Sequence, residues 1–115
     1  MAQSATFLPK ESGESALAKV TQAELERLRS MDVAAVLLRL VDHAKADPTF
    51  KPISAEHTSR WNVTAQGREF ELLLKGPKFY DTRLKRGGGG AIDLAMHLFA
   101  IDFKQAIERL RGAGL

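Results

Sequence analysis

Basic side chains are concentrated in one short stretch of the sequence. Between Lys75 and Arg86 there are five lysine or arginine residues and one acid, Asp81. This stretch therefore carries a formal charge of +4 (5 − 1), although the whole chain carries only +3. Concentrated positive charge attracts polyanions, and binding of nucleic acid gains affinity from the release of counterions. The alternative is a solvated turn in which lysine and arginine keep the chain soluble.

Four consecutive glycines, Gly87–Gly90, follow the basic stretch directly. They match neither of the nucleotide-binding patterns G-x-x-x-x-G-K-[ST] and G-x-G-x-x-G. Glycine nevertheless allows close approach of the backbone, and the helix expected after these residues would begin with unpaired N–H groups. We expect a phosphodiester group to lie there, flanked by Arg83, Lys85 and Arg86. The alternative is a flexible connection whose glycines only permit a sharp turn.

Two aromatic residues, Trp61 and Tyr80, lie near basic residues on expected strands. Trp61 follows Arg60, and Tyr80 comes two residues after Lys78. Aromatic rings interleaved with basic residues on a sheet can stack single-stranded bases. The alternative for both rings is packing in the core. The residues that we expect to contact nucleic acid are Arg60, Trp61, Lys75, Lys78, Tyr80, Arg83, Lys85, Arg86, Gly88 and Gly89.

Other chemistries have little support in the sequence. The nucleophile-elbow pattern G-x-S-x-G is absent, and the pairs of nearby glutamates are explained by a helix start and a strand surface. Cysteine is absent, which removes thiolate metal sites and thiol nucleophiles. We therefore expect no enzyme activity, no metal and no cofactor. The histidines have no partner at the spacing of metal ligands; they are His43, His57 and His97.

Composition indicates one ordinary domain. The chain has 115 residues, of which 44% are hydrophobic and 27% charged, and this argues against wholesale disorder. No apolar run approaches the roughly 18 residues of a membrane span, and the N-terminus lacks the basic and apolar regions of a secretion signal. Together with the absence of cysteine, these features predict a cytoplasmic protein.

Periodicity predicts an α+β fold. Residues 1–20 have no sustained pattern and are expected to form a flexible arm, while 21–115 form the domain. A capping-box spacing begins one helix at Thr21, and a second, long helix is expected over 33–45. A hairpin with Gly67 at its turn and a short third strand follow. The last helix begins after Asp102. The prediction is a small three-stranded antiparallel sheet flanked by N-terminal and C-terminal helices.

Residues 79–94 have the sequence FYDTRLKRGGGGAIDL. This segment resembles, without a gap, the second half of the zinc ribbon at the start of bacterial DnaG-type primases, which reads approximately F-Y-H-C-F-G-C-G-x-G-G-D-A-I-D-F. The similarity continues through residues 96–110, and residues 31–37 are similar to the family's leading helix. The resemblance covers roughly residues 31–112 and is specific from residue 79 onward.

The zinc ligands of that family are missing here. Thr82 and Lys85 stand at the positions of its last two zinc-binding cysteines, and the other two ligands would fall near Trp61 and Thr64. The chain is therefore similar to a zinc-less relative, of the kind found at the front of plasmid- or phage-borne primase-like and mobilisation proteins. A packed core would have to replace the stabilisation that the metal supplies.

The resemblance implies a module that contacts single-stranded template DNA and assists a neighbouring catalytic domain. We expect a non-enzymatic, single-stranded DNA-binding accessory module of a primase-like or relaxase-type mobile-element protein, with a role in DNA replication or conjugative transfer. Its other partners would be a primase, helicase or relaxase domain in the same or another chain. The alternative is a docking module that binds such a protein without touching DNA, for example through an apolar patch around Leu84.

Overall fold

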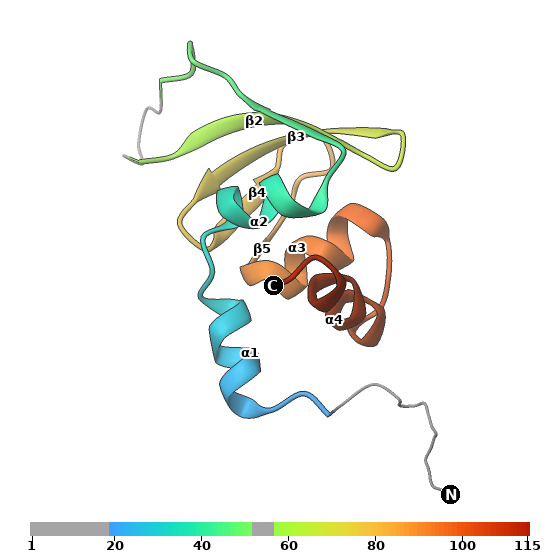
Figure 1. The fold of residues 1–115 in the computed structure, drawn as a ribbon. Coiled ribbons are helices and arrows are strands. Elements are labelled where there is room, and N and C mark those ends of the chain that lie inside the picture. The colour runs from blue at the N-terminus through green and yellow to red at the C-terminus, as the bar shows by residue number, and fades with distance from the viewer. Residues whose placement is uncertain (1–18, 52–56) are drawn as a thin grey trace, which may run out of the picture.

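An antiparallel sheet with helices on one face forms the core of the protein. A computed structural model describes residues 19–51 and 57–115 (Figure 1). Within these residues five strands form one sheet, whose order is also their order along the chain. The α+β class is confirmed, but the predicted three-stranded sheet is wrong, because a strand was missed at each edge. The strands are His43–Ala46 (β1), Ser59–Ala65 (β2), Arg68–Lys75 (β3), Lys78–Asp81 (β4) and Arg86–Gly89 (β5).

The hairpin of β2 and β3 has the predicted turn. Gln66 and Gly67 both have positive φ angles, 51° and 78°, as the two-residue type I′ turn requires. Val63 lies opposite Phe70 in the register, and both side chains are buried. Because successive side chains of a strand alternate between its faces, the apolar residues of this hairpin lie on the side covered by the helices.

The edge strand β1 lies where the long helix over 33–45 was predicted. The helix ends at Leu40, and His43–Ala46 pairs with β2. Asp42 stabilises the change of direction, since its carboxylate accepts the N–H of Gln66 at 3.0 Å and its own N–H donates to a β2 carbonyl. Alanine and lysine have good helix propensity, so the pairing with β2 decides the conformation here.

The glycine run forms the other edge strand, β5, and leads directly into a helix. A Cβ atom on Gly88 would lie 3.0 Å from the Phe79 ring. Gly90 has a φ of +84°, and a Cβ atom there would lie 2.6 Å from the Cα of Arg29. These positions need glycine because other parts of the chain pack closely against the backbone. The alternative interpretation of the glycines, a flexible connection, is therefore wrong, because they form an ordered strand.

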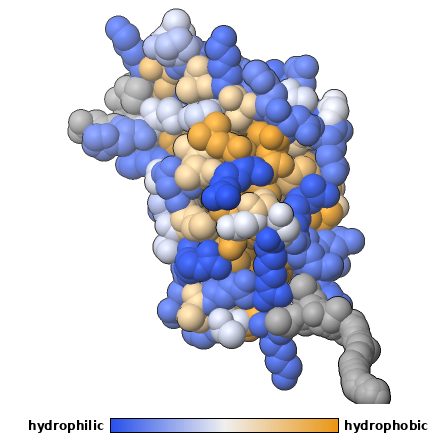
Figure 2. Space-filling model, in the orientation of Figure 1, coloured by the Kyte–Doolittle hydropathy of each residue, from blue (hydrophilic) through white to orange (hydrophobic). Residues whose placement is uncertain are grey.

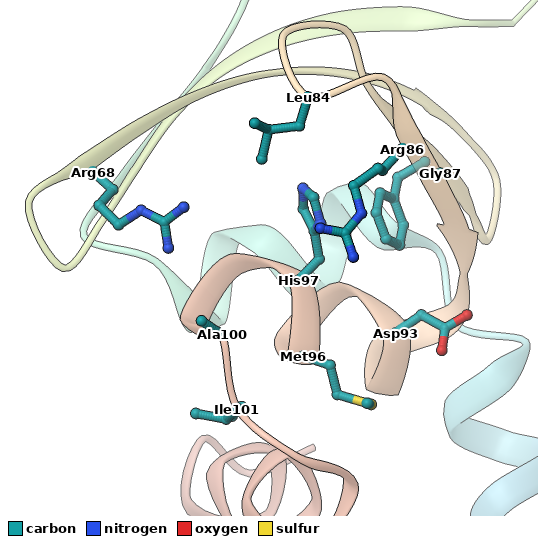
Figure 3. A pocket seen from close by; sticks show the side chains of 10 residues that line it. Arg68, Leu84, Arg86, Gly87, Asp93, Met96, His97, Ala100 and Ile101 are labelled. Atoms are coloured by element: carbon teal, nitrogen blue, oxygen red, sulfur yellow. The ribbon is translucent and has the colours of Figure 1, made fainter.

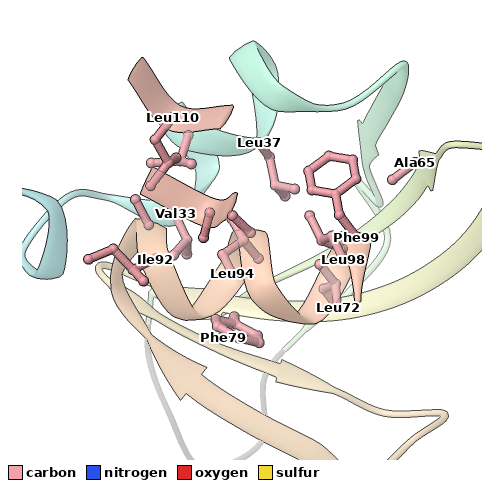
Figure 4. Close-up of a cluster of buried hydrophobic side chains, with 14 of the residues drawn as sticks. Val33, Leu37, Ala65, Leu72, Phe79, Ile92, Leu94, Leu98, Phe99 and Leu110 are labelled. Carbon is pink, nitrogen blue, oxygen red and sulfur yellow. The ribbon is translucent and has the colours of Figure 1, made fainter. Parts of the chain in front are cut away.

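The third helix, α3, is central to the helical layer. It contacts the other three helices of the described residues as well as β5. Its Leu94 and Leu98 are buried together with Leu37 and Leu72 (Figure 4). Full burial of a leucine contributes about 1.5–3 kcal/mol, so this cluster stabilises the fold substantially. The helices are Gln22–Arg29 (α1), Val33–Leu40 (α2), Gly90–Phe99 (α3) and Phe103–Gly112 (α4).

Two predicted helix starts are confirmed by their capping bonds. The Thr21 hydroxyl accepts the N–H of Glu24 at 3.0 Å. Asp102 and Gln105 make both bonds of a capping box, at 2.8 Å and 3.1 Å. The carboxylate of Glu24 accepts two hydrogen bonds from Arg111, at 2.7 Å and 3.0 Å, which lower its pKa and connect α1 to α4.

The predicted arm, residues 1–20, lies almost entirely outside the described residues. Among the described helices, none has the length and apolar character needed to cross a membrane.

On the face shown in Figure 2, apolar side chains gather over α2, and Leu38 of this helix is 64% exposed.

Candidate nucleic-acid interface

The face of the sheet opposite the helices, called the open face below, carries part of the predicted site. Strand alternation directs Lys75, Lys78 and Tyr80 to this face. Lys75 lies directly opposite Lys78 in the register. Within the described residues neither lysine has a carboxylate within 4.0 Å. Like charges directly opposite each other destabilise a sheet, so an anion over this pair would relieve a repulsion.

Tyr80 provides an exposed aromatic surface beside the two lysines. Its side chain is 43% exposed and lies opposite Gly87 of β5. A Cβ atom on Gly87 would come within 3.2 Å of the Tyr80 Cδ1, so the ring leans over the glycine backbone. A tyrosine held in this way can stack on a base, and stacking tolerates any base because every base has a π-face.

Arg60 also lies on the open face, but carboxylates already hold it. Its guanidinium is 2.6 Å from the Asp47 carboxylate and 3.5 Å from that of Glu71. Hydrogen bonds from Thr49 and from Arg60 lower the pKa of Asp47 to about 2. The hydrogen bond to Asp47 in turn raises the pKa of Arg60. A phosphate contact by Arg60 would therefore have to replace an existing ion pair.

Three residues of the predicted set lie on the side of the sheet that faces the helices. Trp61 packs partly buried against the core, and its indole N–H donates to the Ser59 hydroxyl at 2.9 Å. Arg86 and Gly88 lie opposite buried residues of β4 in the register. The ten predicted residues therefore do not form one continuous surface.

The backbone N–H groups at the start of α3 are less available than predicted. The N–H of Gly89 donates to the Asp93 carboxylate at 3.1 Å, and that of Gly90 donates to the carbonyl of Pro77 at 2.7 Å. These bonds already use the donors that were expected to receive a phosphate. The expectation of unpaired N–H groups is thus wrong for these two residues.

The turn between β4 and β5 presents Arg83 and Lys85 to solvent. One oxygen of the Asp81 carboxylate closes this turn, because it accepts the N–H groups of Arg83 and Leu84, each at 2.9 Å. Lys85 adopts a φ of 56° within the turn. Arg83 lines a shallow hollow together with residues of β1, β2 and β3. The two basic side chains thus follow Lys78 and Tyr80 along the chain, at the far end of β4.

Sequence reasoning missed a buried pair formed by Asp81 and His97. Asp81 is 1% exposed, and its second carboxylate oxygen lies 2.7 Å from Nε2 of His97. Burial raises the pKa of Asp81, but the hydrogen bonds from Leu84, His97 and Arg83 outweigh this effect and lower it overall. The sequence sets Asp81 apart as the one acid of the basic stretch, but it does not indicate His97 as its partner.

His97 lies at the edge of the core, between two aromatic rings. Its ring centroid is 5.8 Å from that of Phe70 and 5.6 Å from that of Phe79. In the described part of the chain, no group of three or more His, Cys, Asp or Glu side chains could hold a metal ion.

Comparisons with known proteins give one short similarity. No family model and no solved structure matches the chain. A stretch of 41 residues, 36% of the chain, is 46% identical to the "65 kDa protein" of Zymomonas mobilis. This match covers 7% of the length of that protein.

Proposed function

We propose that the chain is a single-stranded DNA-binding accessory module of a primase-like or relaxase-type mobile-element protein, acting in the cytoplasm. The observation that carries this proposal is the Lys75–Lys78 pair beside the exposed ring of Tyr80 on the open face. Two exposed cations that form no ion pair with any described residue, together with one aromatic ring, are the elements of a site that tracks a phosphate backbone and stacks bases.

The proposed contacts lie on the open face, at the end of β3 and along β4. Lys75 and Lys78 neutralise phosphates, and Tyr80 stacks on a base. Arg83 and Lys85 extend the positive surface beyond the end of the strand. Unstacked bases are needed for this mode, so the site favours a single strand over a duplex.

The resemblance of residues 79–94 to the N-terminal region of DnaG-type primases supports the accessory role. It covers Tyr80, Arg83 and Lys85 directly. On this basis we propose that the module holds template DNA for a primase, helicase or relaxase domain and does not itself catalyse a reaction.

Fluorescence anisotropy with a labelled single-stranded oligonucleotide tests the proposal. The logarithm of affinity should fall with the logarithm of salt concentration, with a slope of about −0.7 per phosphate contact. In a Lys75→Gln/Lys78→Gln variant the slope should become shallower by about 1.4, because two contacts are removed. Tyr80→Ala should leave the slope unchanged and cost about 1–3 kcal/mol of binding free energy.

Lys104→Gln is the matched control, because Lys104 is an exposed lysine on α4, in the helical layer. It should bind with the wild-type slope. An unchanged slope in the double lysine variant, or an equal change in the control, would count against the open face as the binding surface.

A protein-docking module is the second candidate function. Leu84 is 50% exposed at the tip of the β4–β5 turn, surrounded in sequence by basic residues. An exposed leucine there suits an acidic, partly apolar protein surface. Absence of oligonucleotide binding at both low and high salt would favour this function over DNA binding.

A further inference from the structure

A cavity lies on the helix-facing side of the sheet, away from the open face. It has a volume of about 520 Å³ and opens between α3 and the ends of β3 and β5 (Figure 3). This volume is within the range of small-molecule sites, about 300–1,000 Å³. Its wall combines basic side chains with apolar ones, namely Arg68, Arg86 and His97 with Phe79, Leu84, Met96 and Ile101.

Two guanidinium groups, those of Arg68 and Arg86, line this cavity. Arg68 extends from β3 over the ring of Phe70, at 5.0 Å from its centroid. Arg86 lies on β5, and Figure 3 shows its guanidinium beside His97 while Arg68 reaches toward the same opening. Among the described residues no Asp or Glu oxygen lies within 4.0 Å of either guanidinium. Within the described part of the chain, neither cation of the cavity wall therefore forms an ion pair.

His97 adds a third polar group, and Asp81 fixes its orientation. The His97 side chain is 10% exposed, and its Nε2 is bonded to the Asp81 carboxylate. The other ring nitrogen, Nδ1, has no hydrogen-bond partner among the described residues. Polar atoms with little exposure are almost always hydrogen-bonded, so this nitrogen is available to a group that enters the cavity.

The one acid of the cavity wall does not neutralise these groups. Asp93 is exposed, and its carboxylate accepts the N–H of Gly89 at 3.1 Å. In Figure 3 its carboxylate points away from Arg68 and Arg86. The wall therefore remains positive on the side where the two arginines meet His97.

We propose that this cavity binds a phosphate monoester. Two guanidinium forks, one from β3 and one from β5, provide charge-assisted donors on more than one side, which suits the tetrahedral, doubly charged phosphate group better than a planar carboxylate. The cavity has room for more than the phosphate alone, and the organic part of the ligand would lie against Leu84, Met96 and Ile101. This site is separate from the open face and does not depend on the DNA-binding proposal.

Isothermal titration calorimetry with the whole chain tests the site with three probes: inorganic phosphate, adenosine 5′-monophosphate and adenosine. We expect the monophosphate to bind more tightly than inorganic phosphate, and adenosine not to bind. Arg68→Gln and Arg86→Gln should each lower the affinity for the monophosphate by at least about tenfold, because each removes charge-assisted hydrogen bonds. The imidazole ¹⁵N signals of His97 should also shift on binding. An oligonucleotide with a 5′-phosphate, compared with its 5′-hydroxyl form, shows whether a strand end can supply the phosphate.

Arg109→Gln is the matched control, because Arg109 also lies over a ring, that of Phe99 at 4.0 Å, but lines a different hollow. It should leave affinity unchanged, and circular dichroism should show that all three variants are folded. Equal binding of adenosine and its monophosphate, no binding of either phosphate probe at millimolar concentration, or equal losses in Arg86→Gln and Arg109→Gln would overturn the proposal. Loss of oligonucleotide binding through the open-face lysines would leave it intact.

Discussion

Replacement of Asp81 should reveal how much the buried pair stabilises the fold. Its carboxylate accepts hydrogen bonds from the N–H groups of Arg83 and Leu84 and pairs with His97, while only 1% of the residue is exposed. Asp81→Ala leaves these three partners without an acceptor in a site that water barely reaches. Asp81→Asn keeps the volume and one carbonyl oxygen, which can still accept the two N–H groups of the turn.

The expected magnitudes follow from these contacts. Hydrogen bonds to a charged group contribute about 1.5–3 kcal/mol each, and each buried donor left without an acceptor costs about 1–3 kcal/mol. Since the three bonds share one acceptor, their contributions do not add fully. We expect Asp81→Ala to lower the free energy of unfolding by about 3–5 kcal/mol, and Asp81→Asn by about 1–3 kcal/mol.

Urea unfolding followed by the fluorescence of Trp61, the single tryptophan, provides the assay. Asp93→Ala is the control, because this exposed aspartate accepts only one backbone N–H among the described residues. Its replacement should lower the free energy of unfolding by about 1 kcal/mol or less. A loss below about 1 kcal/mol in Asp81→Ala, or equal losses in the Ala and Asn variants, would refute the assignment of Asp81 as a buried acceptor.

The same variants should differ in their pH dependence. Because the pKa of Asp81 is lower in the folded state than its usual 3.8, its contribution to stability is complete above that value. The contribution is lost as the pH falls through the lowered folded pKa, since the carboxylate must then be protonated. The unfolding free energy of Asp81→Asn should therefore decline less than that of the wild type below about pH 4. Parallel declines would contradict the lowered pKa.

Two further predictions concern the backbone and the β1–β2 connection. Gly90→Ala should lower the free energy of unfolding by more than about 2 kcal/mol, because its φ is +84° and the new Cβ would meet the Arg29 backbone at 2.6 Å. Gly112→Ala is the control, because a Cβ atom there would have no neighbour within 4 Å. It should raise the free energy of unfolding by no more than about 1 kcal/mol. Similar urea midpoints for the two variants would show that the packing at Gly90 is looser than described. Arg60→Gln should raise the pKa of Asp47 from about 2 part of the way toward 3.8, as measured by carboxyl-carbon NMR titration, and an unmoved pKa would mean that the ion pair does not form in solution.

Local signals in the sequence predicted the elements that depend on local interactions. The hairpin around Gly67 and the helix starts at Thr21 and Asp102 each depend on residues within a few positions of one another. The two edge strands could not be predicted in this way. Ala44 and Lys45 of β1 favour helix by themselves, and the glycines of β5 carry no strand signal, so both become strands only through pairing with a neighbour.

The same contrast between local and tertiary signals holds for the candidate sites. Strand alternation was enough to place Lys78 and Tyr80 on one face, but the face of Arg86 depended on a strand that was not predicted. The pair of Asp81 and His97 joins the sheet to α3 across the core. No spacing rule connects two such residues, because their contact depends on the tertiary fold alone.

The simple strand order bears on how the chain reaches its native state. Every strand pairs only with its sequence neighbours, so the sheet has low contact order for a β structure. Strands β2 to β5 are separated by short turns, and closing such loops costs little conformational entropy. The connection between β1 and β2, residues 47–58, is longer than these turns. Pairing of β1 with β2 therefore requires closure of a longer loop. We expect the sheet to grow as a zipper from the central hairpin, with β1 among the last parts to add.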